Sequence, residues 1–112
     1  MISRQKKESR KQFQMQVIQR DRYCRIRNCQ TPKLGLSAHH LLGKGGGGSD
    51  VTDNGITLCC NHHVPGVHTK GVGWLVANVR QQPGHDVTAD ADGELYVNGV
   101  LLKSFAMRGR EL

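Results

Sequence analysis

The spacing of the apolar side chains predicts a short amphipathic helix near the N-terminus. Phe13, Val17 and Ile18 recur at helical spacing with glutamines between them, and the Ser9 hydroxyl could cap the first turn. We therefore expect a helix over residues 10–20. Its apolar stripe should pack on a core while its arginine and lysine side chains face outwards.

Further along, short apolar runs between turn signals predict strands. One strand is expected within residues 34–42 and another at residues 56–58, with Asp53-Asn54-Gly55 as a turn between them. A glycine run over residues 45–49 has the composition of a linker, but it falls between these strands, so we interpret it as a loop of the site. A second helix is expected near residues 74–79, before Pro83-Gly84.

The C-terminal part alternates strand and turn signals. Strands are expected at residues 86–88, 95–97 and 100–102, and Asn98-Gly99 is a strong hairpin signal. These patterns predict an α+β fold with an N-terminal helix and a C-terminal β-hairpin. The predicted organisation is a basic, flexible tail at residues 1–8, a domain at residues 9–82 and a β-hairpin extension at residues 83–112.

The positive charge of the chain is concentrated at one end. The net charge is +7, and residues 1–27 hold nine basic and two acidic side chains, so this segment accounts for all of the excess. Such a segment attracts phosphate backbones, although a solvated tail is the plainer interpretation of residues 1–8 alone. The side chains that we expect to contact DNA are Arg4, Lys6, Lys7, Arg10, Lys11 and Lys44.

The cysteines and histidines have the types and spacings of metal ligands. The N-terminus has no apolar stretch typical of a secretory signal, which favours metal ligation over disulfides for the four cysteines. Pairs of the spacing C-x4-C and C-x2-H suit two zinc knuckles that close a tetrahedron around a structural zinc ion. Cys60 is a rival for the fourth position, and ordinary buried thiols are the alternative to any metal site. The expected zinc ligands are Cys24, Cys29, Cys59 and His62.

The order of the remaining residues resembles a known nuclease family. The pair His39-His40, a glycine-rich loop, Asn54 and the cluster Cys59-Cys60-Asn61-His62-His63 closely resemble the HNH endonucleases over about residues 20–70. The resemblance implies a small ββα-metal core, also called the His-Me finger, with a structural zinc site. Two departures are His62, where a fourth cysteine is usual, and a separation of five residues between His63 and His68, where four is common.

The resemblance also implies the catalytic roles. His40 takes the position of the general base that activates water, and Asn54, which has no useful pKa, takes an orienting position. His39, His63 and His68 take the positions of ligands to one catalytic divalent ion, namely Mg, Mn, Ni or Zn. The implied products carry 5′-phosphate and 3′-hydroxyl ends. His85 lies outside both clusters and receives no role.

The leading hypothesis is therefore a metal-dependent DNA endonuclease. A zinc-stabilised nucleic-acid-binding module without catalysis is the alternative, and a nuclease subunit of a phage DNA-processing assembly is a third hypothesis. DNA is the expected partner, the oligomeric state is not indicated, and a cytoplasmic or host-cell intracellular location is expected. The sequence has no apolar run of the roughly 18 residues that a membrane span needs.

Overall fold

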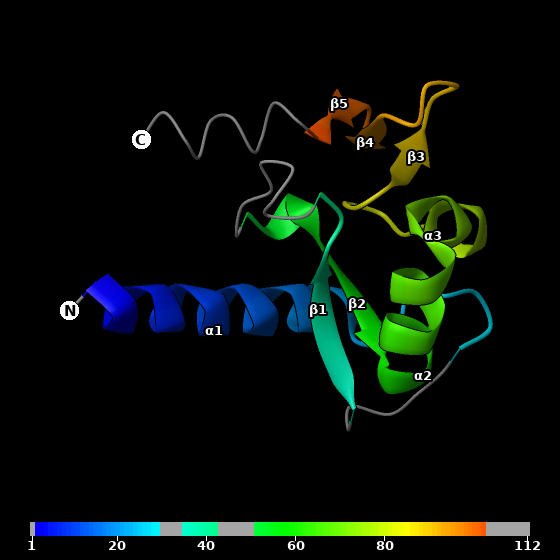
Figure 1. The fold of residues 1–112 in the computed structure, drawn as a ribbon. Helices are drawn as coiled ribbons and strands as arrows, with labels where there is room; N and C mark the ends of the chain where they lie inside the picture. Colours follow the sequence, from blue (N-terminus) through cyan, green and yellow to red (C-terminus); the bar gives the residue numbers. More distant parts are fainter. Residues whose placement is uncertain (1, 30–34, 43–50, 103–112) are drawn as a thin grey trace.

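The computed structural model describes residues 2–29, 35–42 and 51–102, which form a small α+β structure as expected (Figure 1). A two-stranded and a three-stranded antiparallel sheet are combined with short helical segments and one long helix. In chain order the elements are α1 (Ile2–Asp21), β1 (Leu36–His40), η2 (Thr52–Asn54), β2 (Gly55–Cys59), α2 (Cys60–His62), η3 (His63–His68), α3 (Val72–Asn78), β3 (Val87–Ala89), β4 (Leu95–Val97) and β5 (Val100–Leu101).

The N-terminal helix is longer than its apolar stripe suggested. It begins at Ile2 and not at residue 10, so Ser9 lies inside the helix and is not its N-cap. Arginine, lysine, glutamine and glutamate, which fill residues 4–8, are good helix formers, and this explains why the helix extends beyond the stripe. The N-terminal half of α1 projects past the hairpin (Figure 1). A flexible tail at residues 1–8 stays a prediction.

The β1–β2 hairpin is covered on both faces. Its register pairs His40 with Gly55 and His39 with Ile56, and every residue of β2 is buried. Gly55 and Thr57 approach α1, while Ile56 belongs to the core cluster on the opposite face, which includes residues of η3 and α3. Because side chains alternate along a strand, contacts on both faces explain why consecutive residues of β2 are all buried, polar Thr57 included.

The contact between α1 and β2 depends on the small size of Gly55. A Cβ atom added at Gly55 would lie 2.5 Å from Cγ2 of Val17 and 2.7 Å from Cζ of Phe13. The φ angle of Gly55 is −109°, which any residue adopts, so space rather than backbone conformation requires the glycine. The turn residue expected from the sequence is therefore also the point of closest approach between helix and hairpin.

We expect Gly55→Ala to lower the free energy of unfolding by about 1–3 kcal/mol, because α1 must shift to admit the methyl group. Gly73→Ala is the matched control: no heavy atom lies within 4 Å of a Cβ added there. That exposed helical site should be neutral or more stable by roughly 0.5–1 kcal/mol. Urea unfolding followed by circular dichroism measures both changes, and equal effects of the two substitutions would contradict the close approach.

The C-terminal sheet packs in the same core as the hairpin. Strands β3, β4 and β5 confirm the expected strand positions, and Asn98 and Gly99 have φ angles of 54° and 80°, typical of a tight hairpin turn. Val87, Val97 and Leu102 share one buried cluster with Leu58 of β2. The described part of the predicted extension is thus packed against the hairpin, and residues 103–112 lie outside the described residues.

Candidate functional site

Three cysteines and one histidine gather where the N-terminal helix, β2 and α2 meet. Cys24 follows α1, Cys59 ends β2 and His62 ends α2. Cys29 is brought back by a turn in which Asn28 has a φ angle of 66° and the Cys29 N–H donates to the Ile26 carbonyl at 3.1 Å. The four residues predicted as zinc ligands therefore lie together.

The geometry of this Cys3His cluster fits a tetrahedral metal ion. Its four ligand atoms lie within 4.8 Å of one another. Nδ1 of His62 is 3.4 Å from Sγ of Cys24 and 3.2 Å from Sγ of Cys59, while the Sγ atoms of Cys29 and Cys59 are 3.9 Å apart. A zinc tetrahedron with ordinary bond lengths has edges of roughly 3.5–3.8 Å. The cluster could therefore hold a metal such as zinc.

The chemistry of the cysteines agrees with that assignment. All four are free thiols, and Cys60, the rival ligand, is exposed and is not part of the cluster. Burial raises the pKa of the Cys24 thiol to about 12. A thiolate at this position therefore needs a nearby cation, and a bound metal supplies one.

A second group of residues, the histidine cluster, consists of His39 from β1 with His63 and His68 from η3. One ring nitrogen of each lies within 4.8 Å of the others, and Nε2 of His63 is 3.0 Å from Nε2 of His68. Residues 63–68 form a π-helical turn. Since a π-helix repeats its contacts every five residues, the separation that departed from the family pattern places His63 and His68 on the same side of this turn.

The environment of the histidine cluster favours neutral imidazoles, which is the form that binds a metal ion. Burial, and then the charges of His63, His68 and His40, lower the pKa of His39 to about 4. Burial also lowers the pKa of His63. The Ser37 hydroxyl lies 3.2 Å from Nδ1 of His63, so that nitrogen can carry the proton while Nε2 keeps its lone pair towards His68. Unlike the Cys3His cluster, this group is open to solvent at His68.

His40 lies on the other face of β1. Its ring stacks on Phe13 of α1, with centroids 4.6 Å apart and an angle of 5° between the planes. The stacking limits the orientations of the imidazole. His39 and His40 thus project to opposite faces of one strand, as consecutive strand residues do.

Asn54 is buried and bonded to the chain just beyond His40. Its side chain forms two bonds with Leu42: Oδ1 accepts from the Leu42 N–H at 2.8 Å, and Nδ2 donates to the Leu42 carbonyl at 3.1 Å. Its own carbonyl accepts from the Leu41 N–H at 2.8 Å. These bonds hold the end of β1 against the turn that precedes β2.

The basic residues predicted to contact DNA are only partly described. Arg10 and Lys11 are exposed on α1. Lys44, and the side chains of Arg4, Lys6 and Lys7, lie outside the described residues.

Two residues near the site were missed by sequence reasoning. Ser37 could have been found, because it stands two residues before His39 and so shares its strand face. His85, which received no role, is fully buried and lies 2.9 Å from the Asp53 carbonyl. Only the folded chain brings it there, because 32 residues separate the two.

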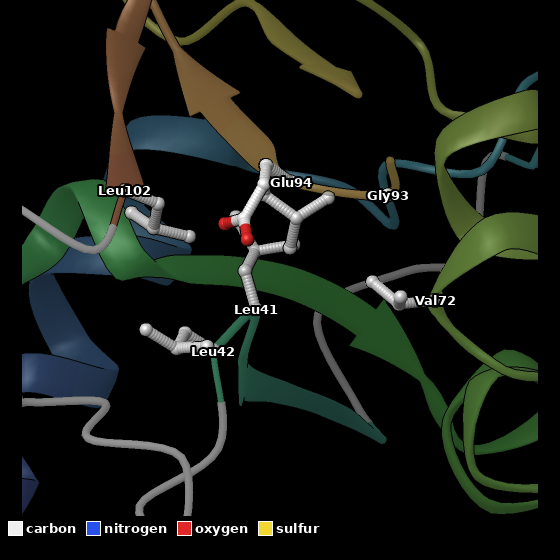
Figure 2. Close-up of a pocket in the computed structure, with 7 residues that line it drawn as sticks. Leu41, Leu42, Val72, Gly93, Glu94 and Leu102 are labelled. Atoms are coloured by element: carbon white, nitrogen blue, oxygen red, sulfur yellow. The ribbon is translucent and has the colours of Figure 1, made fainter. Parts of the chain in front are cut away.

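A separate pocket lies between the end of β1 and the C-terminal sheet (Figure 2). Its volume is about 160 Å³, and its lining consists of Leu41, Leu42, Val72, Gly93, Glu94, Leu95 and Leu102. It includes no residue of either metal-type cluster, so it is distinct from the candidate site.

Within the described ranges, no helix combines the length and apolar character needed to cross a membrane.

Comparison of the chain with protein-family models, with curated proteins and with solved structures found no match. The resemblance to HNH endonucleases therefore rests on the residues and their arrangement.

Proposed function

We propose that this protein is a metal-dependent DNA endonuclease of the HNH type. The observation that carries the proposal is the histidine cluster, in which His39, His63 and His68 come together beside a separate Cys3His cluster. A closed four-ligand set suits a structural ion, whereas three exposed or half-buried histidines leave room for substrate. The hairpin and the following η3 segment would then be the ββα-metal core.

His40 is the proposed general base. A neutral imidazole accepts a proton from water near physiological pH, and the Phe13 ring holds this one in place. Because β1 is an edge strand of the two-stranded sheet, a phosphate group laid along that edge would meet His40 from one face and the histidine cluster from the other. A divalent ion on that cluster would polarise the phosphate and stabilise the 3′ leaving oxygen.

Asn54 and the basic residues have supporting roles in this proposal. Asn54 keeps the end of β1 in one conformation through its bonds with Leu42. Arg10 and Lys11 are exposed on the projecting helix α1, where they would bind the phosphate backbone without reading sequence. The products expected from this arrangement are 5′-phosphate and 3′-hydroxyl ends.

The test is cleavage of supercoiled plasmid by purified protein that has been treated briefly with EDTA, shown to be folded with its structural zinc retained, and then supplied with Mg, Mn, Ni or Zn. We expect nicking or linearisation with at least one ion and none without. His63→Ala should abolish the activity, because it removes one of the three proposed ligands, while Cys60→Ser should leave it unchanged.

A zinc-stabilised nucleic-acid-binding module is the second candidate, and the Cys3His cluster favours it because that cluster supports a fold without chemistry. Retained DNA binding by folded, zinc-loaded protein that cuts with no ion would reject the nuclease in favour of this module.

A further inference from the structure

We propose that half-buried Arg20 and buried Asp21, Arg25 and His85 form a positioning network that fixes the turn carrying Asn54, and through it the end of β1 that carries His40. The catalytic part of this inference rests on the proposed nuclease function. The network joins two segments that contain none of the proposed catalytic or metal-ligating histidines, namely the C-terminal end of α1 with Arg25 just beyond it, and the segment that follows α3.

Each carbonyl group of the turn accepts a hydrogen bond. Arg20 donates from Nη1 to the Thr52 carbonyl and from Nη2 to the Gly55 carbonyl, each at 2.7 Å. His85 lies with Nε2 2.9 Å from the Asp53 carbonyl. Together with the bond from Leu41 to the Asn54 carbonyl, four consecutive carbonyls are occupied by donors from three parts of the chain.

Asp21 is the centre of this network. It is buried, and it accepts bonds from Arg20 at 2.7 and 2.9 Å, from Arg25 at 3.1 Å and from Gln82 at 2.8 Å. It also accepts the Thr57 N–H of β2 at 3.0 Å. Although burial opposes ionisation, the bonds and charges of Arg20 and Arg25 hold the pKa of Asp21 below its ordinary value. A buried carboxylate with this many donors fixes its neighbours tightly.

The bonding of His85 assigns its tautomer. Nη1 of Arg25 lies 2.8 Å from Nδ1 of His85, and a guanidinium can only donate. Nδ1 must therefore accept, which places the proton on Nε2, where it is donated to the Asp53 carbonyl. Nη2 of Arg25 also donates to the His85 carbonyl at 2.8 Å, so Arg25 fixes both the ring and the backbone of this residue.

The consequence reaches the proposed base through two short links. The Asn54 side chain bonds to Leu42, and its carbonyl bonds to Leu41, which directly follows His40. A turn that moves would move the end of β1. Displacement of a catalytic group by about 1 Å costs on the order of 100-fold in rate.

The test compares Arg20→Lys with Arg22→Lys in the full-length, zinc-loaded protein. A lysine at position 20 keeps the charge but cannot bridge two carbonyls and Asp21 at once. Arg22 is exposed, so Arg22→Lys is a control for the same chemical change. We expect Arg20→Lys to lower kcat for plasmid cleavage by roughly 10- to 100-fold with KM unchanged. It should also speed hydrogen exchange at the Leu41 and Leu42 amides, and Arg22→Lys should do neither.

Two substitutions at His85 provide a second, independent comparison. His85→Gln can still present an amide N–H towards the Asp53 carbonyl, whereas His85→Asn can accept from Arg25 but is too short to reach that carbonyl. We expect His85→Gln to have a higher kcat for plasmid cleavage than His85→Asn. The Leu41 and Leu42 amides should also exchange more slowly in His85→Gln than in His85→Asn. Equal behaviour of the two variants would overturn the role of His85.

The two readouts separate failure of this inference from failure of the proposed function. Unchanged exchange at Leu41 and Leu42 in Arg20→Lys would overturn the network whatever the activity. Faster exchange with kcat unchanged would overturn its catalytic role. Faster exchange in a protein that never cleaves DNA would support the network as a device that holds the turn and reject the nuclease.

Discussion

Cys24→Ser is expected to leave the protein mostly unfolded, even with zinc in excess. Cys24 is fully buried, and its Sγ is one of the four ligand atoms whose arrangement fits tetrahedral coordination of a metal ion. A serine hydroxyl does not replace a thiolate ligand. Structural zinc contributes on the order of 10 kcal/mol in small metal-bound units, which is comparable with the total stability of about 5–15 kcal/mol of a folded domain.

Urea unfolding by circular dichroism, together with zinc content after dialysis, measures this effect. Cys60→Ser is the control, because Cys60 is exposed and lies outside the cluster although it follows Cys59 directly. It should keep its zinc and its unfolding midpoint. Loss of zinc from Cys60→Ser with retention in His62→Ala would instead make Cys60 the fourth ligand.

His40→Ala is expected to lower the rate of plasmid cleavage by roughly 10²- to 10⁴-fold, the contribution typical of a general base. The zinc content and the affinity for DNA should stay as in the unmodified protein, because His40 belongs to neither metal-type cluster. Initial rates of nicking at saturating metal measure the effect.

His40→Phe separates the chemistry of the ring from its packing. His40 stacks on Phe13, so alanine removes an aromatic contact worth about 0.5–1.5 kcal/mol as well as the base. Phenylalanine keeps a ring against Phe13 and has no proton acceptor. Both variants should show the same loss of cleavage rate, and His40→Phe should be the more stable. Cleavage by His40→Phe at the rate of the unmodified protein would exclude His40 as the base.

Much of the fold was predictable because local patterns and tertiary packing agree. The strands expected at residues 56–58 and 95–97 lie within β2 and β4. The hairpin at Asn98-Gly99 followed from backbone preference alone. The extent of α1 was not predictable from its apolar stripe, because Ile2 to Ser9 continue the helix beyond the face that packs on the hairpin.

The Cys3His cluster was predictable because ligand chemistry restricts residue types and spacing, whereas the histidine cluster was predicted through the resemblance to HNH endonucleases. The spacing of His63 and His68 was the weak point, since an α-helix would separate two residues five apart. The π-helical turn brings them together. Pro65-Gly66 indicated a short or distorted helix in this segment, but the sequence did not indicate a π-helical turn. The network around Asp21 was not predictable for another reason: Arg25 and His85, which bond to each other in it, are 60 residues apart in the sequence.

The shared core also limits how this chain could be reused. Val87, Val97 and Leu102 pack in one cluster with Cys59, a member of the Cys3His cluster. A fragment ending at residue 82 would leave exposed the part of this core that these three residues cover. The segment that carries the two clusters is therefore not expected to fold when transferred alone to another protein. A fusion enzyme that includes it would need the C-terminal sheet as well.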